Sequence, residues 1–227
     1  MKRLIFTFTL IICFGIAKSQ NEKAINLQQY DSKPIHFGFG LGVSRMNFNV
    51  KSNSLISDSI NVSSAKNYGF NLSISSNLRL NRFIDIRFTP AISFIKESLH
   101  FNLINNSNIT EVPFNIQSTN LELPLLLKIK YKRFRNVRPY LILGGNYRFN
   151  FNADKSNRSS SLIKLNNSDF SFEFGLGMDH FFKYYKFSPE LKFSLGLQNL
   201  NSLIGTIYSR AIDKMTSRIF ILNFFFE

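Results

Sequence analysis

The sequence is poor in cysteine, which cross-links a chain, and in proline and glycine, which interrupt helices and strands. Its 227 residues include one cysteine, Cys13, no tryptophan, six prolines and eleven glycines. A single cysteine cannot form an intrachain disulfide, and Cys13 lies in a segment that we expect to be removed, so no thiol nucleophile or thiolate metal ligand is expected. The small share of proline and glycine, with 44% hydrophobic residues, excludes a fibrous protein and argues against disorder.

Long apolar runs are missing from most of the chain. The main one, Leu4–Ile16, follows Met1-Lys2-Arg3, precedes small residues at 17 and 19, and is too short to span a bilayer. These features predict a secretory signal peptide. Because the rest of the chain has no apolar run long enough for a transmembrane helix, any crossing of a membrane must be made by strands. We expect a signal peptide at 1–19, a periplasmic N-terminal tail at 20–34 and a β-barrel domain in the outer membrane at 35–227.

Polar and apolar side chains alternate with a period of two in eight segments. Each segment has about the 9 to 11 residues or more that a tilted strand needs to cross a bilayer. The segments lie near 35–46, 67–80, 82–98, 118–131, 137–151, 169–182, 186–198 and 217–226. One face of each is almost wholly Phe, Leu and Ile. The sequence therefore predicts an all-β protein, an eight-stranded antiparallel up-and-down transmembrane β-barrel.

The expected connections alternate in length. Long loops rich in Ser and Asn are expected at 47–66, 99–117, 152–168 and 199–216, and tight turns at Asn81, 132–136 and 183–185. This asymmetry is typical of outer-membrane barrels, with long extracellular loops and with short turns and both termini in the periplasm. The alternative is a soluble lipocalin-like barrel, in which the apolar face would point inward.

The face opposite the apolar rows carries charges of both signs in equal number. We predict that they form a polar network in the lumen: Arg79, Asp85, Arg87, Glu122, Lys128, Arg148, Glu173, Asp179, Glu190 and Lys192. Charged side chains commonly fill the interior of a small barrel, so a structural role for these residues is favoured over a catalytic one. An eight-stranded barrel filled in this way has no channel wide enough for solutes or for a folded protein.

Catalytic and metal-binding patterns are absent from the sequence. The three histidines, His36, His100 and His180, are scattered, and no set of metal ligands has a recognisable spacing. We expect no enzyme activity, no catalytic residue, no cofactor, no metal and no small-molecule substrate.

Positive charge gathers beside the expected tight turns. Acidic residues are few, 14 against 28 Lys and Arg, which gives a net charge of +14. The basic collar consists of Arg82, Lys130, Lys132, Arg133, Arg135, Arg138, Lys183 and Lys186. Two interpretations stay open: the collar contacts lipid headgroups, or it docks an acidic periplasmic protein. Nucleic acid is not an expected partner of an exported barrel.

Several segments resemble one family of bacterial barrels. They are Leu121–Lys128 (LELPLLLK), Arg138-Pro139-Tyr140 leading to Gly144-Gly145, Gly175–Asp179, Phe187–Ser194 (FSPELKFS) and Ala211-Ile212-Asp213 before a Phe-rich final strand. Together they look like the PorT family of outer-membrane barrels of Bacteroidota. The final strand also resembles the aromatic-rich last strands of bacterial barrels, from which the extra Glu227 departs.

The resemblance implies a component of the type IX protein secretion system, which in some species supports gliding motility. Because the lumen is expected to be filled, the implied role is that of an accessory with protein partners in the secretion machinery, in contact with outer-membrane lipid. The family brings no catalytic residues. Two alternatives remain: a structural or adhesive barrel whose loops contact surfaces, and a lipid-modifying enzyme.

Overall fold

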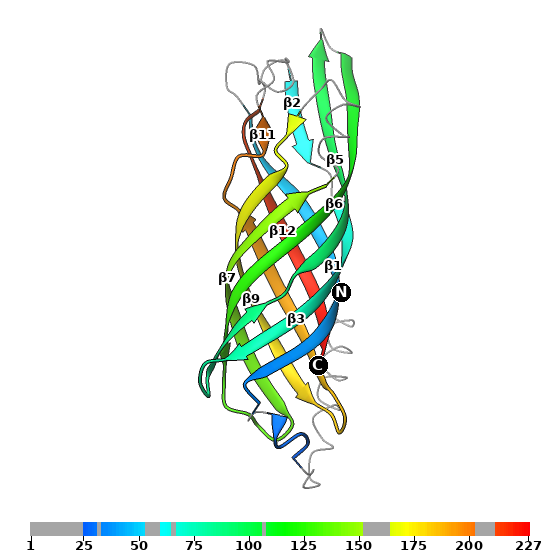
Figure 1. Cartoon of the computed structure of the whole chain (residues 1–227). Helices are drawn as coiled ribbons and strands as arrows, with labels where there is room; N and C mark the ends of the chain where they lie inside the picture. The colour runs from blue at the N-terminus through cyan, green and yellow to red at the C-terminus, as the bar shows by residue number, and fades with distance from the viewer. Residues whose placement is uncertain are drawn as a thin grey trace, which may run out of the picture.

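The structure is a computed structural model in which residues 25–30, 33–52, 60–64, 67–105, 108–151, 164–202 and 212–227 are described. They form a tall cylinder of tilted strands (Figure 1). The predicted signal peptide at 1–19 lies outside the described residues. No helix in the described part of the chain is both long and apolar enough to cross a membrane.

Twelve strands are assigned within these residues, all paired antiparallel. They are β1 (Ile35–Ser52), β2 (Ile60–Ser64), β3 (Asn67–Arg79), β4 (Ile84–Phe88), β5 (Ala91–Asn105), β6 (Asn108–Lys130), β7 (Val137–Asn150), β8 (Lys164–Leu165), β9 (Ser168–Phe181), β10 (Lys186–Gly196), β11 (Asn201–Ser202) and β12 (Ile212–Phe226). Neighbours in sequence pair in an up-and-down order. The ring closes where β1 pairs with β12, for example Phe39 with Phe226.

Strands β4 and β5 are two parts of one barrel strand. Both pair with β3 on one side and with β6 on the other. They are separated at Thr89-Pro90, where Pro90 has no N–H to donate to a ladder. Counted in this way, the described residues form a ring of eight antiparallel strands, which confirms the predicted fold class.

The two faces of the sheet point as the alternation predicts. Phe37 is 69% exposed and Ile74 is 64% exposed on the outer surface, whereas Ser75, the residue after Ile74, is fully buried in the interior. The other Phe and Leu rows also face outward. A lipocalin-like arrangement is excluded, because it would place these rows inside.

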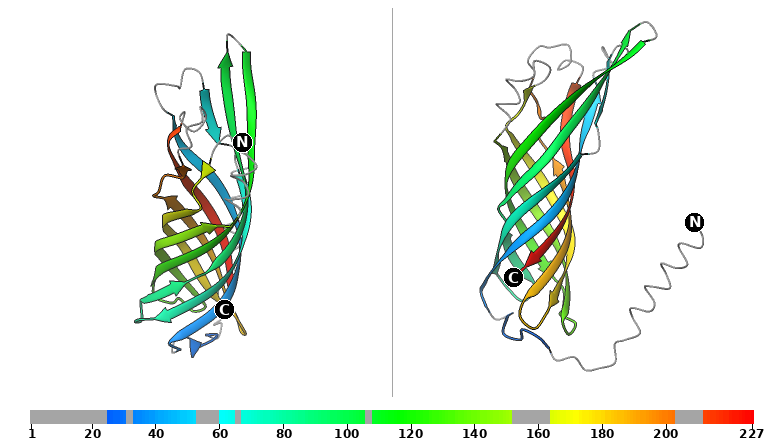
Figure 2. Two further views of the ribbon diagram at one scale, coloured as in Figure 1. Left: turned by 45° about the horizontal axis from the view of Figure 1, so that its top comes forward. Right: turned by 90° about the vertical axis from the view of Figure 1, so that its right-hand side faces the viewer.

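The two ends of the barrel differ. The turns at 80–83, 131–136 and 182–185 share one end, here named the turn end, and the opposite end is named the loop end (Figure 1). At the loop end the prediction of long irregular loops is wrong for most of 99–117, because β5 and β6 stay paired as far as Asn105 and Asn108. Their hairpin projects beyond the ring (Figure 2). The predicted loop starting at 47 is also shortened, since β1 continues to Ser52.

Candidate functional site

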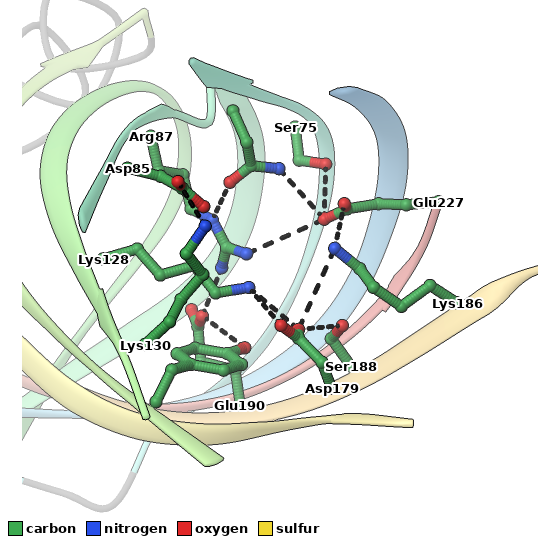
Figure 3. A network of polar contacts seen from close by, with 12 residues as sticks. Ser75, Asp85, Arg87, Lys128, Lys130, Asp179, Lys186, Ser188, Glu190 and Glu227 are labelled. Atoms are coloured by element: carbon green, nitrogen blue, oxygen red, sulfur yellow. Dashed lines mark hydrogen bonds and ion pairs between the residues drawn. The ribbon is translucent and has the colours of Figure 1, made fainter. Parts of the chain in front are cut away.

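The turn-end half of the lumen is organised around one guanidinium group. Arg87 of β4 is fully buried, and its Nη1 contacts Glu190 Oε2 of β10 at 2.5 Å. Its Nε donates to Asn77 Oδ1 of β3 at 2.6 Å, and its Nη2 lies 3.7 Å from Glu227 Oε1 (Figure 3). One side chain thus connects strands on opposite sides of the barrel.

Lysines complete this turn-end cluster. Lys128 Nζ lies 2.8 Å from Asp179 Oδ1, which also accepts a hydrogen bond from the Ser188 hydroxyl at 2.7 Å. Lys186 forms ion pairs with Glu227 and, at 3.9 Å, with Asp179 (Figure 3). Every charge in the cluster therefore has an opposite charge within reach, as burial requires.

A second cluster of charges fills the loop-end half. Arg148 of β7 lies between Glu122 of β6 at 3.3 Å and Asp169 of β9 at 3.4 Å. Lys192 Nζ contacts Glu173 Oε2 at 2.7 Å. These five side chains are all buried.

Nine of the ten residues predicted for the lumen network are buried and make ion pairs. They are Asp85, Arg87, Glu122, Lys128, Arg148, Glu173, Asp179, Glu190 and Lys192. The prediction is wrong for Arg79, which is the last residue of β3 and donates from Nε to the Asn81 carbonyl oxygen in the turn at 3.4 Å.

Sequence reasoning missed four other charges of the network, namely Lys130, Asp169, Lys186 and Glu227. Lys130 Nζ contacts Asp85 Oδ1 at 2.5 Å, and Asp169 accepts a hydrogen bond from Ser217 at 2.5 Å. Each of the four lies one or two steps of the period-two alternation from a buried residue of the same strand face, so extending the inner rows toward both ends of each strand identifies them.

Apolar side chains occupy the space between the charges. Strand β12 buries Met215, Ile219, Ile221 and Phe225, and across the lumen lies a cluster of Leu126, Tyr140 and Ile142. The rings of Phe225 and Tyr140 lie 5.1 and 5.3 Å from the Arg87 guanidinium carbon. The interior described here is therefore packed with side chains from every strand of the ring.

An N-terminal segment covers the lumen at the turn end. The Tyr30 ring stacks on His36 with centroids 4.1 Å apart, and its hydroxyl donates to Glu227 Oε2 at 2.7 Å. The Asn26 side-chain amide donates to the Phe181 carbonyl oxygen at 3.0 Å, and Arg133 donates to the Asn26 carbonyl oxygen. We name residues 25–30 the tail latch, because these contacts tie them to three parts of the turn end.

The two partners Tyr30 and Glu227 have opposite pKa shifts. Burial, and then the negative charge of Glu227, raise the pKa of Tyr30 well above its ordinary value, so the phenol stays a donor. Burial disfavours the charged form of Glu227, but Lys186, Lys128 and Arg87 outweigh it and lower its pKa to about 2. The latch thus joins a neutral hydroxyl to an ionised carboxylate.

The predicted basic collar is only partly on the surface. The prediction is wrong for Lys130, Lys186 and Arg138, which are buried, the first two with carboxylate partners in the lumen. Arg133 lies over the Phe181 ring at 3.7 Å and holds the tail latch. The exposed members are Arg82, Lys132, Arg135 and Lys183.

A basic hollow remains between two of the turns. It has a volume of about 300 Å³ and is lined by Phe83, Tyr131 and six basic residues. The basic residues are Arg79, Arg82, Lys130, Lys132, Arg133 and Arg138. The lining set contains no carboxylate, so the hollow favours an anionic group.

Catalytic chemistry has little support in this geometry. The buried carboxylates contact Lys or Arg, and no group of three or more His, Cys, Asp or Glu side chains suitable for a metal ion occurs in the described part of the chain. The His36 ring stacks on Tyr30. His180 lies in β9 next to Phe181, whose ring contacts Tyr30. The expectation that the protein is not an enzyme stays a prediction.

An apolar exterior around a closed antiparallel ring with a charged, filled interior defines the class of outer-membrane β-barrels. The chain belongs to the family described as outer membrane protein beta-barrel domain, whose family model matches residues 18–202. A membership of this kind places the protein in the outer membrane, in contact with its lipids.

Comparison with solved structures returns small outer-membrane barrels. OprG from Pseudomonas aeruginosa has 12% identity, with 83% of this chain and 93% of that chain covered and a TM-score of 0.44. Ail, the attachment invasion locus protein of Yersinia pestis, has 10% identity, with 86% and 98% covered and a TM-score of 0.37. Neisserial surface protein A has 12% identity, with 85% and 98% covered and a TM-score of 0.40. A comparison with curated protein sequences finds no match.

Proposed function

We propose that the protein is a PorT-like accessory component of type IX protein secretion, with its turn end and both termini in the periplasm. The secretion role comes from the resemblance of the LELPLLLK and FSPELKFS segments and their neighbours to the PorT family of Bacteroidota. The accessory role rests on the lumen, which is filled with side chains. No catalytic step, cofactor or small-molecule substrate is part of this proposal.

The observation that carries the accessory role is the Arg87 contact across the lumen. Ion pairs from Arg87 to Glu190 and Glu227, and from Lys128 to Asp179, cross the space through which a substrate would pass. Opening such a path would separate buried opposite charges, which is strongly unfavourable. The barrel therefore supports a separate translocon, and it does not conduct the exported proteins.

The basic hollow at the turn end supplies a surface for a protein of the secretion machinery. Its exposed cations Arg82 and Lys132 have no carboxylate partner among the described residues. An acidic segment of a periplasmic partner complements this charge.

The first experiment tests the secretion role with a clean deletion of the gene. Loss of the exported cargo proteins from the culture supernatant, measured by quantitative mass spectrometry and restored by the wild-type gene, is the expected result. Normal export with reduced attachment to surfaces would instead favour an adhesive barrel, for which the projecting β5–β6 hairpin is the structural argument (Figure 2). Altered lipid A acyl chains with normal export would favour the enzyme alternative.

The second experiment tests docking at the turn end. Arg82→Glu with Lys132→Glu reverses two exposed charges of the hollow, and Lys51→Glu with Lys214→Glu reverses two exposed charges at the loop end as a matched control. Affinity purification from outer membranes is expected to lose partner proteins only with the first pair. Equal recovery with both pairs would reject the docking site and leave lipid headgroups as the contact of the collar.

A further inference from the structure

The outer surface of the barrel carries a groove over the seam where the ring closes. It has a volume of about 660 Å³ and lies over β1, β12 and β10, with Tyr68 of β3 at its side. The apolar residues of its lining that lie on the outer face are Val43, Tyr68, Phe193, Leu195, Phe220 and Leu222. Most of these side chains are exposed and continue the Phe and Leu rows of the membrane face.

Two arginines lie at the end of this groove that is nearer the loop end. Arg45 of β1 and Arg218 of β12 both point outward and are exposed. Arg45 is opposite Phe220, and Arg218 is opposite Asn47, so the two arginines are diagonal neighbours on one face of the β1–β12 pair. Side chains in this relation are within reach of one another, and two guanidinium groups are therefore able to share one anion.

The surroundings of the two arginines are apolar. Arg45 is also directly opposite Tyr68 on β3, and Arg218 is opposite Leu195 on β10. No carboxylate contacts either arginine anywhere in the part of the chain that the structure describes. The nearest residues of β1 and β12 toward the turn end on the same face are Val43 and Phe220, so the arginines stand at the border of the apolar band.

A cation at this border is placed to pair with an anion that the membrane supplies. An outward-facing Arg is costly deep in the bilayer and is tolerated near the interface, where its head reaches the polar layer. Phosphate is the anion of that layer, and the planar guanidinium binds it with two hydrogen bonds. The apolar groove next to the two arginines suits the acyl chain of a lipid that carries this phosphate.

We propose that this groove binds one phosphorylated membrane lipid, with Arg45 and Arg218 holding the phosphate and the apolar residues between β1, β12 and β10 holding an acyl chain. The site is independent of the secretion role, because it uses a different surface from the turn end. It also places a lipid across the seam between the first and last strands of the ring.

The test is lipid binding by the purified full chain in detergent, measured by native mass spectrometry. Each phosphorylated lipid is compared with a dephosphorylated lipid of equal chain length. The wild type is expected to bind diphosphorylated lipid A at least about 10-fold more tightly than its dephosphorylated counterpart. The same preference is expected for phosphatidylglycerol if the site accepts any phospholipid. Arg45→Gln with Arg218→Gln is expected to remove this preference, and Arg45→Lys with Arg218→Lys to retain part of it.

The matched control is Lys51→Gln with Lys214→Gln, which removes two charges from directly opposite positions on the same strands, outside the groove. This control is expected to bind as the wild type does. A wild type that ignores the phosphate, or a glutamine variant with unchanged binding, would overturn the proposal. So would equally tight binding of inorganic phosphate alone, since the groove would then add nothing to the affinity. A wild-type dimer that the glutamine variant converts to a monomer would identify a second copy as the occupant instead.

Discussion

The hydroxyl of Tyr30 and the carboxylate of Glu227 join the two ends of the described chain across 197 positions, with a hydrogen bond of 2.7 Å. Tyr30 comes from the tail latch outside the ring, and Glu227 follows the last strand and turns into the lumen. The contact therefore links the cover of the turn end to the ion pairs inside. Glu227 thereby connects the tail latch to Lys186 and Arg87.

Removing the hydroxyl of Tyr30 is expected to loosen the tail latch. Tyr30→Phe keeps the ring that stacks on His36 and loses a hydrogen bond to a charged group, which contributes about 1.5–3 kcal/mol. Hydrogen exchange of the peptide containing 25–30 is expected to accelerate about 10- to 100-fold, because local opening costs correspondingly less. Tyr184→Phe, in the exposed turn at 182–185, is the control and is expected to change nothing. Equal exchange in the Tyr30 variant and the wild type would show that stacking alone holds the latch.

The latch is expected to open in acid. The pKa of Glu227 is lowered from 4.5 to about 2, so its folded form favours the ionised carboxylate. A lowered pKa stabilises the folded contact above the unfolded value, and this stabilisation is lost as the pH falls from 4.5 toward 2. The protection of the latch amides, measured as their hydrogen-exchange rate relative to that of an unstructured peptide at the same pH, is expected to fall across this range in the wild type and to stay flat in Glu227→Gln. A flat wild-type profile would contradict the assignment.

Arg87 is expected to be the most sensitive charge in the turn-end cluster. Arg87→Leu leaves Glu190 and Glu227 with fewer cations in a buried site, and breaking a buried pair on one side costs about 3–5 kcal/mol. Urea unfolding in lipid vesicles measures this loss as a lower midpoint. Adding Glu190→Gln to Arg87→Leu removes the stranded charge and is expected to recover part of the stability. A double variant no more stable than the single one would place the cost in lost packing against Phe225 and Tyr140.

Two adjacent glycines provide an internal comparison of inner and outer packing. A Cβ atom at Gly144 would lie 2.2 Å from the Leu125 carbonyl oxygen, which is backbone and cannot move aside. A Cβ atom at Gly145 would lie 3.1 Å from the Phe170 ring, which faces outward and is able to shift. Gly144→Ala is therefore expected to lower the free energy of unfolding by about 1–3 kcal/mol, and Gly145→Ala by clearly less. Equal effects in the same urea assay would contradict this difference.

The alternation of side chains predicted most of the barrel and much of the lumen. It failed at strand ends, because a period-two pattern does not state where a strand stops. Arg79 and Lys130 show both errors: Arg79, predicted for the lumen, ends β3 and donates to the turn at Asn81, and Lys130, predicted for the surface, pairs with Asp85 inside. The paired hairpin up to Asn105 and Asn108 is missed for a related reason: its Ser and Asn content suggests a loop, although Leu99, Phe101 and Leu103 continue the period-two alternation of the strand.

The sequence by itself determined the class of the fold, because one apolar residue at every second position leaves a strand only two faces and only one of them suits lipid. It also determined that the inner face had to balance its charges. Which charge meets which was decided only by the closed ring, in which residues a hundred positions apart, such as Arg87 and Glu190, lie opposite each other across the lumen. The same closure brought Arg45 beside Arg218 and Tyr30 to Glu227, since the register between the first and last strands is fixed by the whole barrel and by no local segment.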